Sequence, residues 1–235
     1  MNSKNRPRHI FSFSAIPLLL GVLSLALTLP SCSDDSGVDG PVEMQFWDIV
    51  TYEGSPSGGG STFSFQQVDD SPLITLTSTS SLKDVKEGER MAVRYIPESG
   101  QAYTSGAIRL LSASKITQSP VEIEWKEEYD EWKRDKVYVY SVWRSGNYIN
   151  FHVRLTYDTE PRLFRLVADP STIESDIPDI YLVHIMAKET DYHDRAYLAS
   201  FDIGELWTRQ NLRGVRIHVA NSNLDKDIFT FTKNN

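Results

Sequence analysis

The side chains whose types could support chemistry gather in residues 189–195. This segment carries Glu189, Asp191, His193 and Asp194, which are three carboxylates and an imidazole within six positions. Oxygen ligands at alternating positions can hold Ca²⁺, but the segment lacks the glycine and the twelve-residue spacing of a known calcium loop. A polar turn between two strands is the simpler interpretation. Whether Asp191, His193 and Asp194 bind a metal stays open, and we assign no metal ligand.

Other arrangements typical of catalysis do not occur in the sequence. There is no Gly-x-Ser-x-Gly elbow, and the glycine-rich residues 58–60 lack the lysine and the following helix of a phosphate-binding loop. Paired carboxylates for glycoside cleavage remain an alternative, because their separation is set by the fold. We therefore predict a protein that is not an enzyme, with no catalytic residue and no cofactor.

Three histidines fall in the predicted strands. His152 and His218 lie on polar strand faces, where we expect plain surface residues. His184 shares a face with Leu182 and Met186, so we expect it to be partly buried and hydrogen-bonded, because buried polar groups usually find a partner.

Residues 1–31 have the layout of an export signal. Lys4, Arg6 and Arg8 precede an uncharged stretch over residues 10–33, as in a signal peptide with a positive start and an apolar middle. A spanning helix is the alternative, since about 20 apolar residues cross a bilayer. Two serines and a proline interrupt the front half, so we predict a cleaved signal peptide.

The single cysteine, Cys32, ends this stretch. The segment Leu29–Cys32 (LPSC) resembles the lipobox of bacterial lipoproteins, in which the chain is cut before the cysteine and a diacylglycerol is attached to it; Pro30 departs from the usual residue. A lone thiol in an exported chain otherwise calls for an explanation, and polar neighbours do not suit a buried one. Two or three acyl chains anchor a protein stably, so we predict lipidation at Cys32 and membrane attachment through this anchor.

The residues that follow bear on location. We predict residues 32–41 to be a lipidated, flexible tether. Residues 33–35 (SDD) resemble the acidic export signals that send Bacteroidota lipoproteins to the outer face of the outer membrane, and a plain acidic tether is the alternative. We expect an outer-membrane lipoprotein of the cell envelope and leave surface exposure open.

Charge bears on the class of partner. The chain has 24 basic and 32 acidic residues and a net charge of −8, and the leader removes three bases and no acid. Nucleic-acid binding depends on Lys and Arg that neutralise phosphates, so we exclude nucleic acid.

Strand patterns predict an all-β protein. Residues 42–118 carry short apolar runs at 44–51, 62–68, 73–78, 90–96 and 107–117, which favour a small OB-like barrel. Residues 137–235 predict an antiparallel β-sandwich, with a hairpin of strands 137–144 and 148–158, further strands at 162–168, 179–188, 195–203, 213–220 and 227–232, and a helical turn at 204–208.

An acidic connector is predicted between them at 119–136. Trp125, Tyr129 and Trp132 are expected to form its packing side, with a carbohydrate-stacking platform as the alternative.

Two segments carry a family resemblance. Gly88–Tyr95 (GERMAVRY) and Ser141–Phe151 (SVWRSGNYINF) resemble the NigD-like lipoprotein family of Bacteroidota. The resemblance covers residues 42–231 and implies an OB-like barrel followed by a β-sandwich, with no established activity. Trp143 and Tyr148 flank a turn where Gly146 or Asn147 would accept positive φ cheaply, so we interpret the second segment first as a folding device.

These observations predict a lipid-anchored envelope protein that binds a partner protein or a glycan without catalysis. A carbohydrate-active envelope hydrolase is one alternative, and a bacteriocin-immunity lipoprotein, which follows from the family name, is another.

Overall fold

The computed structural model describes residues 43–124, 126–127, 129, 135–156, 163–185 and 194–233. The predictions for the signal peptide, Cys32 and the tether lie outside these residues, as do Asp191 and His193. Within these ranges, no helix has the length and apolar character to cross a bilayer.

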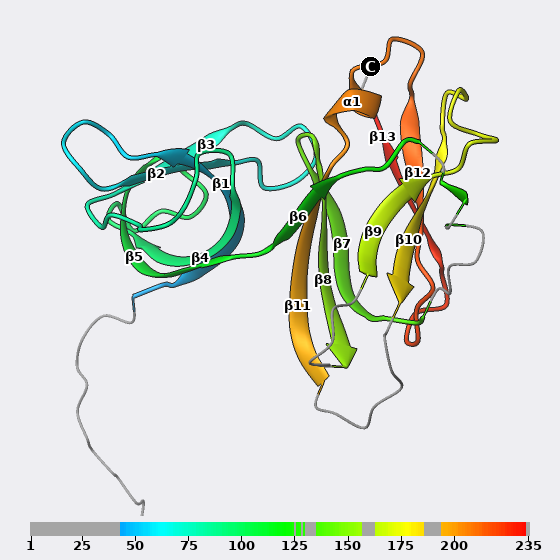
Figure 1. Ribbon diagram of the computed structural model, residues 1–235. Coiled ribbons are helices and arrows are strands. Elements are labelled where there is room, and N and C mark those ends of the chain that lie inside the picture. The colour runs from blue at the N-terminus through cyan, green and yellow to red at the C-terminus, as the bar shows by residue number, and fades with distance from the viewer. Residues whose placement is uncertain are drawn as a thin grey trace, which may run out of the picture. The chain divides into compact units, whose positions relative to one another are not determined.

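The first five strands close into a barrel (Figure 1). The ring closes because β1 pairs with both β2 and β4. Alternate side chains fill its interior, among them Val50, Phe63, Leu76 and Val93. The strands are β1 (Phe46–Gly54), β2 (Ser61–Phe65), β3 (Ile74–Ser78), β4 (Arg90–Pro97) and β5 (Gly106–Lys115), in the order β1-β2-β3-β5-β4.

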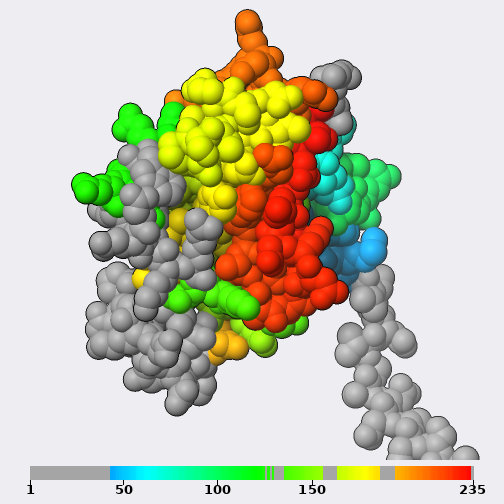
Figure 2. Space-filling view, turned by 90° about the vertical axis from the view of Figure 1, so that its right-hand side faces the viewer, coloured from blue at the N-terminus to red at the C-terminus, as the bar shows by residue number. Residues whose placement is uncertain are grey.

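The remaining strands form two four-stranded sheets. One has the order β6-β11-β8-β7 and the other β13-β12-β10-β9. Figure 2 shows one face on which the yellow segment of β10 and the orange to red segments of β12 and β13 lie side by side. The elements are β6 (Thr117–Pro120), β7 (Tyr138–Ser145), β8 (Tyr148–Thr156), β9 (Leu163–Ala168), β10 (Asp179–Ile185), β11 (Asp194–Asp202), α1 (Gly204–Trp207), β12 (Gly214–His218) and β13 (Ile228–Thr232).

One large apolar cluster forms the core of the sandwich, and a smaller one contains Tyr129, Val167 and Val183. The rings of Phe151, Phe164 and Phe201 meet with centroids 5.6 to 6.2 Å apart, a spacing typical of favourable aromatic pairs. The predicted all-β class, an OB-like barrel followed by a sandwich, is confirmed.

The sandwich differs from the prediction in two strand pairs. Strand β6 runs parallel to β11, and β10 runs parallel to β12, whereas we expected antiparallel pairing throughout. Only Ile116 separates β5 from β6, so the chain passes from the barrel directly into the sheet. The direction of β6 in this sheet is therefore set by the end of β5.

The start of the predicted acidic connector 119–136 is therefore part of the sandwich. Residues 119 and 120 belong to β6, and Val121 and Tyr129 are buried in apolar clusters. Tyr129 packs as expected, whereas Trp125 and Trp132 lie outside the described residues.

Candidate functional site

The turn of the β7–β8 hairpin is hydrogen-bonded to the barrel. Gly146 has φ +57°, a conformation that glycine adopts at little cost. Its N–H donates to the Asp69 carbonyl at 2.8 Å, and the Asp69 N–H donates to the Arg144 carbonyl at 2.8 Å. Ser145 Oγ donates to the Gln66 carbonyl at 2.6 Å. The hairpin is thus a folding device, as expected, and it also joins the barrel to the sandwich.

Arg144 forms an ion pair where the hairpin meets the barrel. Its side chain is fully buried, and Nη1 and Nη2 donate to the two carboxylate oxygens of Asp70 at 2.8 and 2.7 Å. The guanidinium lies 4.5 Å from the Trp207 ring centroid. Hydrogen bonding to Arg144 holds the pKa of Asp70 below its usual range. A bidentate pair fixes orientation as well as charge, so Arg144 holds the barrel loop against the sandwich.

Arg90 makes a second buried contact between the domains. Its Nε donates to Ser200 Oγ at 3.0 Å, Nη1 to Thr51 Oγ1 at 2.9 Å and Nη2 to Asn150 Oδ1 at 3.2 Å. The guanidinium also lies 4.1 Å from the centroid of the Tyr148 ring. Burial lowers the pKa of Arg90 to about 10, so it stays charged at neutral pH. Hydroxyl and amide oxygens and an aromatic face surround this buried cation.

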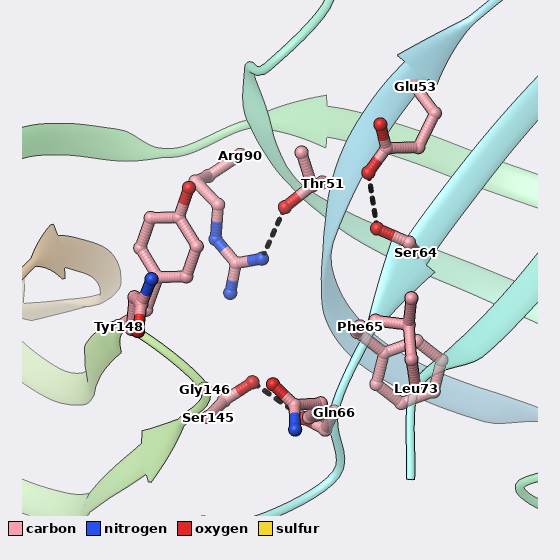
Figure 3. Close-up of a pocket in the computed structure, with 11 residues that line it drawn as sticks. Thr51, Glu53, Ser64, Phe65, Gln66, Leu73, Arg90, Ser145, Gly146 and Tyr148 are labelled. Carbon is pink, nitrogen blue, oxygen red and sulfur yellow. Dashed lines mark hydrogen bonds between the residues drawn. The ribbon is translucent and has the colours of Figure 1, made fainter. Parts of the chain in front are cut away.

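A cavity of about 290 Å³ opens beside Arg90. Figure 3 shows Arg90 and Tyr148 on one side of it, and Glu53 and Ser64 on the other. Glu53 is its one carboxylate among the described lining residues and accepts a hydrogen bond from Ser64. The cavity is lined by Thr51, Glu53, Ser64, Phe65, Gln66, Leu73, Arg90, Ser145, Gly146, Asn147 and Tyr148.

A row of exposed and half-buried rings crosses from the barrel to the sandwich. Trp47 of β1 lies 5.9 Å from His152 of β8, His152 lies 4.7 Å from Tyr140 of β7, and Tyr140 lies 5.2 Å from Tyr138, all between ring centroids. The guanidinium of Arg154 lies 4.2 Å from the Tyr138 ring centroid. We call these five residues the aromatic strip.

A β-bulge sets the position of Tyr140. The register of β7 against β8 shifts between Val139 and Ser141, so Tyr140 is the extra residue. As a result Tyr140 and Ser141, although consecutive, are both exposed. Bulges re-aim side chains and often occur near functional sites.

The predicted histidines have three different environments. The Nδ1 of His184 lies 3.2 Å from the Asp135 carbonyl, so the predicted hydrogen bond is confirmed, and the side chain is buried more completely than the partial burial that we expected. His152 belongs to the aromatic strip, and burial lowers its pKa. His218 stacks on Tyr181 with centroids 4.5 Å apart, and its Nε2 lies 2.6 Å from an Asp179 oxygen. The interpretation of His152 and His218 as plain surface residues was wrong, because each packs against an aromatic ring.

The polar segment 189–195 enters the described residues only at its end. There, Asp194 pairs with Arg154 at 3.2 Å. Among the described residues, no three His, Cys, Asp or Glu side chains are placed to hold a metal ion.

Sequence reasoning missed Arg90, Arg144, Trp47 and Tyr140. Arg90 and Arg144 lie inside the two segments of the family resemblance. A local signal existed for Arg144, because its strand partner is the buried Ile149, so alternation places it on the core face. Two-fold alternation gives no signal for the bulge at Tyr140.

The barrel and the two-sheet sandwich define an all-β protein. No protein-family model matches the sequence, and no curated protein matches it. The fold is that of several solved structures from Bacteroides.

A protein of unknown function from Bacteroides vulgatus is similar over 81% of this chain and 92% of its own, with a TM-score of 0.64 and 18% identity. A NigD-like immunity protein from Bacteroides caccae is similar over 80% and 92%, with a TM-score of 0.57 and 16% identity. A proposed lipoprotein from Bacteroides fragilis is similar over 81% and 96%, with a TM-score of 0.54 and 15% identity. These likenesses establish the fold and agree with the NigD-like resemblance. None of the three descriptions names an enzyme.

Proposed function

We propose that this chain is a lipid-anchored protein of the bacterial outer membrane that binds a partner glycan or protein without catalysis. The observation that carries the proposal is the aromatic strip, in which Trp47 and Tyr140 are 41% and 50% exposed. Large exposed aromatics that no core uses mark interaction sites.

The buried arginines support this function because they fix the surface that carries the strip. Arg90 and Arg144 hold β1 and the β2–β3 loop against β7 and β8. A binding surface composed of two domains keeps its shape only when the domains do not move, and preorganisation lowers the entropic cost of binding.

The carboxylates that line the cavities support an envelope hydrolase less well than the aromatic strip supports a binding protein. Glycoside cleavage needs two carboxyl groups about 5 to 9 Å apart across the scissile bond, and Glu53 is the one carboxylate among the described lining residues of the Arg90 cavity. A second cavity, of about 410 Å³, has Glu122, Glu124 and Glu205 in its wall but no aromatic side chain among the described residues. Lys126 and Arg165 pair with Glu122 there.

The anchor is tested by fractionating cells that produce the wild-type chain or Cys32→Ser. We expect the wild type in the outer-membrane fraction, with a diacylglyceryl group on Cys32 detected by mass spectrometry. We expect the Cys32→Ser variant to carry no acyl group. An unmodified Cys32 thiol, or a leader still attached, would disprove the anchor. Incubation with polysaccharides tests the absence of catalysis: their chain length should not change.

A second candidate is protection against a bacteriocin, because one protein of the same fold is a NigD-like immunity protein. Deleting the gene should then sensitise cells to a bacteriocin from a neighbouring strain, and the Cys32→Ser chain should fail to restore resistance. Unchanged sensitivity after deletion would reject this candidate.

A further inference from the structure

The aromatic strip is a composite of ring faces and polar groups rather than an apolar patch. Its four rings follow one another at centroid distances of 5.9, 4.7 and 5.2 Å. In the part of the chain that the structure describes, the hydroxyls of Tyr138 and Tyr140 make no hydrogen bond. The exposed Ser141 beside them adds a third hydroxyl. Such a surface offers stacking and hydrogen bonding along the same line.

The charges on the strip are nearly balanced. Its one permanent cation, Arg154, pairs with Asp194 at 3.2 Å and lies over the Tyr138 ring. Burial lowers the pKa of His152 and so favours its neutral imidazole. The whole chain has a net charge of −8. A neutral strip on an acidic protein favours an uncharged ligand over an anionic one such as a nucleic acid or an anionic lipid surface.

The shape of the strip favours a glycan over a protein partner. Protein hot spots are aromatic or aliphatic anchors that fill well-packed, desolvated pockets. Here the rings are partly exposed and follow one another from β1 of the barrel to β8 and β7 of the sandwich. A sugar ring has an apolar C–H face and a rim of hydroxyls, which matches tyrosine and tryptophan rings that have an apolar body and a polar end.

We propose that the aromatic strip binds a neutral glycan chain. Two sugar rings of the same chain stack on Trp47 and on Tyr140, and the sugar hydroxyls bond to Tyr138, Ser141 and His152. This inference rests on the proposed binding function and names the class of ligand.

The test uses the full-length chain purified in detergent, with tryptophan fluorescence and calorimetry as readouts. The probes are neutral hexasaccharides of β-1,4-glucose, α-1,4-glucose, β-1,4-xylose and α-1,6-mannose, with hexagalacturonate as the charged comparison. We expect at least one neutral hexasaccharide to bind, and raising the salt to 0.5 M to leave its affinity within about twofold, because no net charge is neutralised.

Variants then locate the site. Trp47→Ala and Tyr140→Ala should each weaken binding about tenfold or more, and Trp47→Phe should weaken it less because a stacking ring remains. Tyr181→Ala is the matched control, since Tyr181 stacks on His218 in the other sheet and its loss should leave affinity unchanged. Thermal unfolding verifies that each variant is folded.

Three outcomes would overturn the proposal. The first is that no neutral hexasaccharide binds. The second is that the wild type and both strip alanine variants bind sugar equally. The third is that the chain binds phosphatidylethanolamine–phosphatidylglycerol vesicles through the strip but binds no sugar. None of them affects the anchor, which the Cys32→Ser experiment tests separately. Sugar binding that survives both strip substitutions would refute the strip as the site but leave a binding function in place.

Discussion

The Nη2 group of Arg90 donates a hydrogen bond to Asn150 Oδ1 at 3.2 Å across the boundary between barrel and sandwich. Each residue comes from one of the two segments that resemble the NigD-like family. Ser200 completes the group, because its Oγ accepts from Arg90 Nε and donates to the same Asn150 oxygen at 2.8 Å. The two segments therefore meet in space and join the barrel to the sandwich.

We expect Arg90→Met to destabilise the protein by about 3 kcal/mol, because the change leaves Asn150 and Ser200 buried with lost hydrogen bonds. The triple variant Arg90→Met, Asn150→Leu and Ser200→Ala should recover much of this loss, since removing all partners together leaves no unpaired polar group. Urea unfolding of the two variants measures the difference. A triple variant that is less stable than Arg90→Met would show that the apolar side chains do not fit the site.

The Arg144–Asp70 pair gives a second prediction. Arg144→Lys should destabilise the chain by about 2 to 3 kcal/mol although it keeps the charge, because an ammonium group cannot donate to both oxygens of Asp70 in the same plane. Arg213→Lys is the control, since Arg213 pairs with Asp176 at the surface with 72% and 51% exposed side chains, where we expect less than about 1 kcal/mol. Equal losses in urea unfolding would contradict the special role of Arg144.

The barrel contains a glycine at a very close approach. Gly60 has φ +93°, and a Cβ there would lie 2.2 Å from the Ser78 carbonyl oxygen. Gly60→Ala should cost about 3 kcal/mol or more, because the clash is with backbone. Gly88→Ala separates the cost of the steric clash from the cost of the positive φ. Gly88 has φ +85° with no atom within 4 Å of the added Cβ. Only the backbone cost of about 1 kcal/mol therefore applies at this position. The two free energies of unfolding should differ accordingly.

Asp48 makes stability depend on pH. Its carboxylate accepts a hydrogen bond from Tyr95 at 2.9 Å, and burial raises its pKa from 3.8 to about 6. The folded state thus binds the proton more tightly than the unfolded state. The tighter proton binding by Asp48 adds to the free energy of unfolding. This added stability is fully present below about pH 4 and is lost as the pH rises to about 6, for a total of about 2 to 3 kcal/mol.

We therefore expect Asp48→Asn to be more stable than wild type at pH 7.5 and to lose the fall in stability between pH 4 and pH 6. Urea unfolding across this range measures it. Asp179→Asn is the control of opposite sign, because hydrogen bonding to Arg216 holds the pKa of Asp179 below its usual value, so this variant should be less stable than wild type at neutral pH. A parallel pH response of Asp48→Asn and wild type would contradict the assignment.

Much of the fold could be predicted because two-fold alternation is a local signal. Strand β8 has buried Phe151 and Val153 alternating with the half-buried His152 and Arg154, which reproduces the expected pattern. No local pattern in the sequence shows which strands pair with one another, so the parallel contact of β6 with β11 could not be predicted. The candidate site was missed for the same reason: Trp47 and His152 are 105 positions apart in the sequence, and only the contact between the domains brings their rings to 5.9 Å.

The single residue Ile116 between β5 and β6 has a practical consequence for dissecting this protein. An expression boundary placed after residue 118, where the composition changes, would cut β6 in half and remove an edge strand from the sheet β6-β11-β8-β7. The truncated sheet would present the unpaired backbone of β11 to solvent, a template for aggregation. To produce the sandwich alone, the expressed chain should begin before Thr117, so that β6 is kept whole.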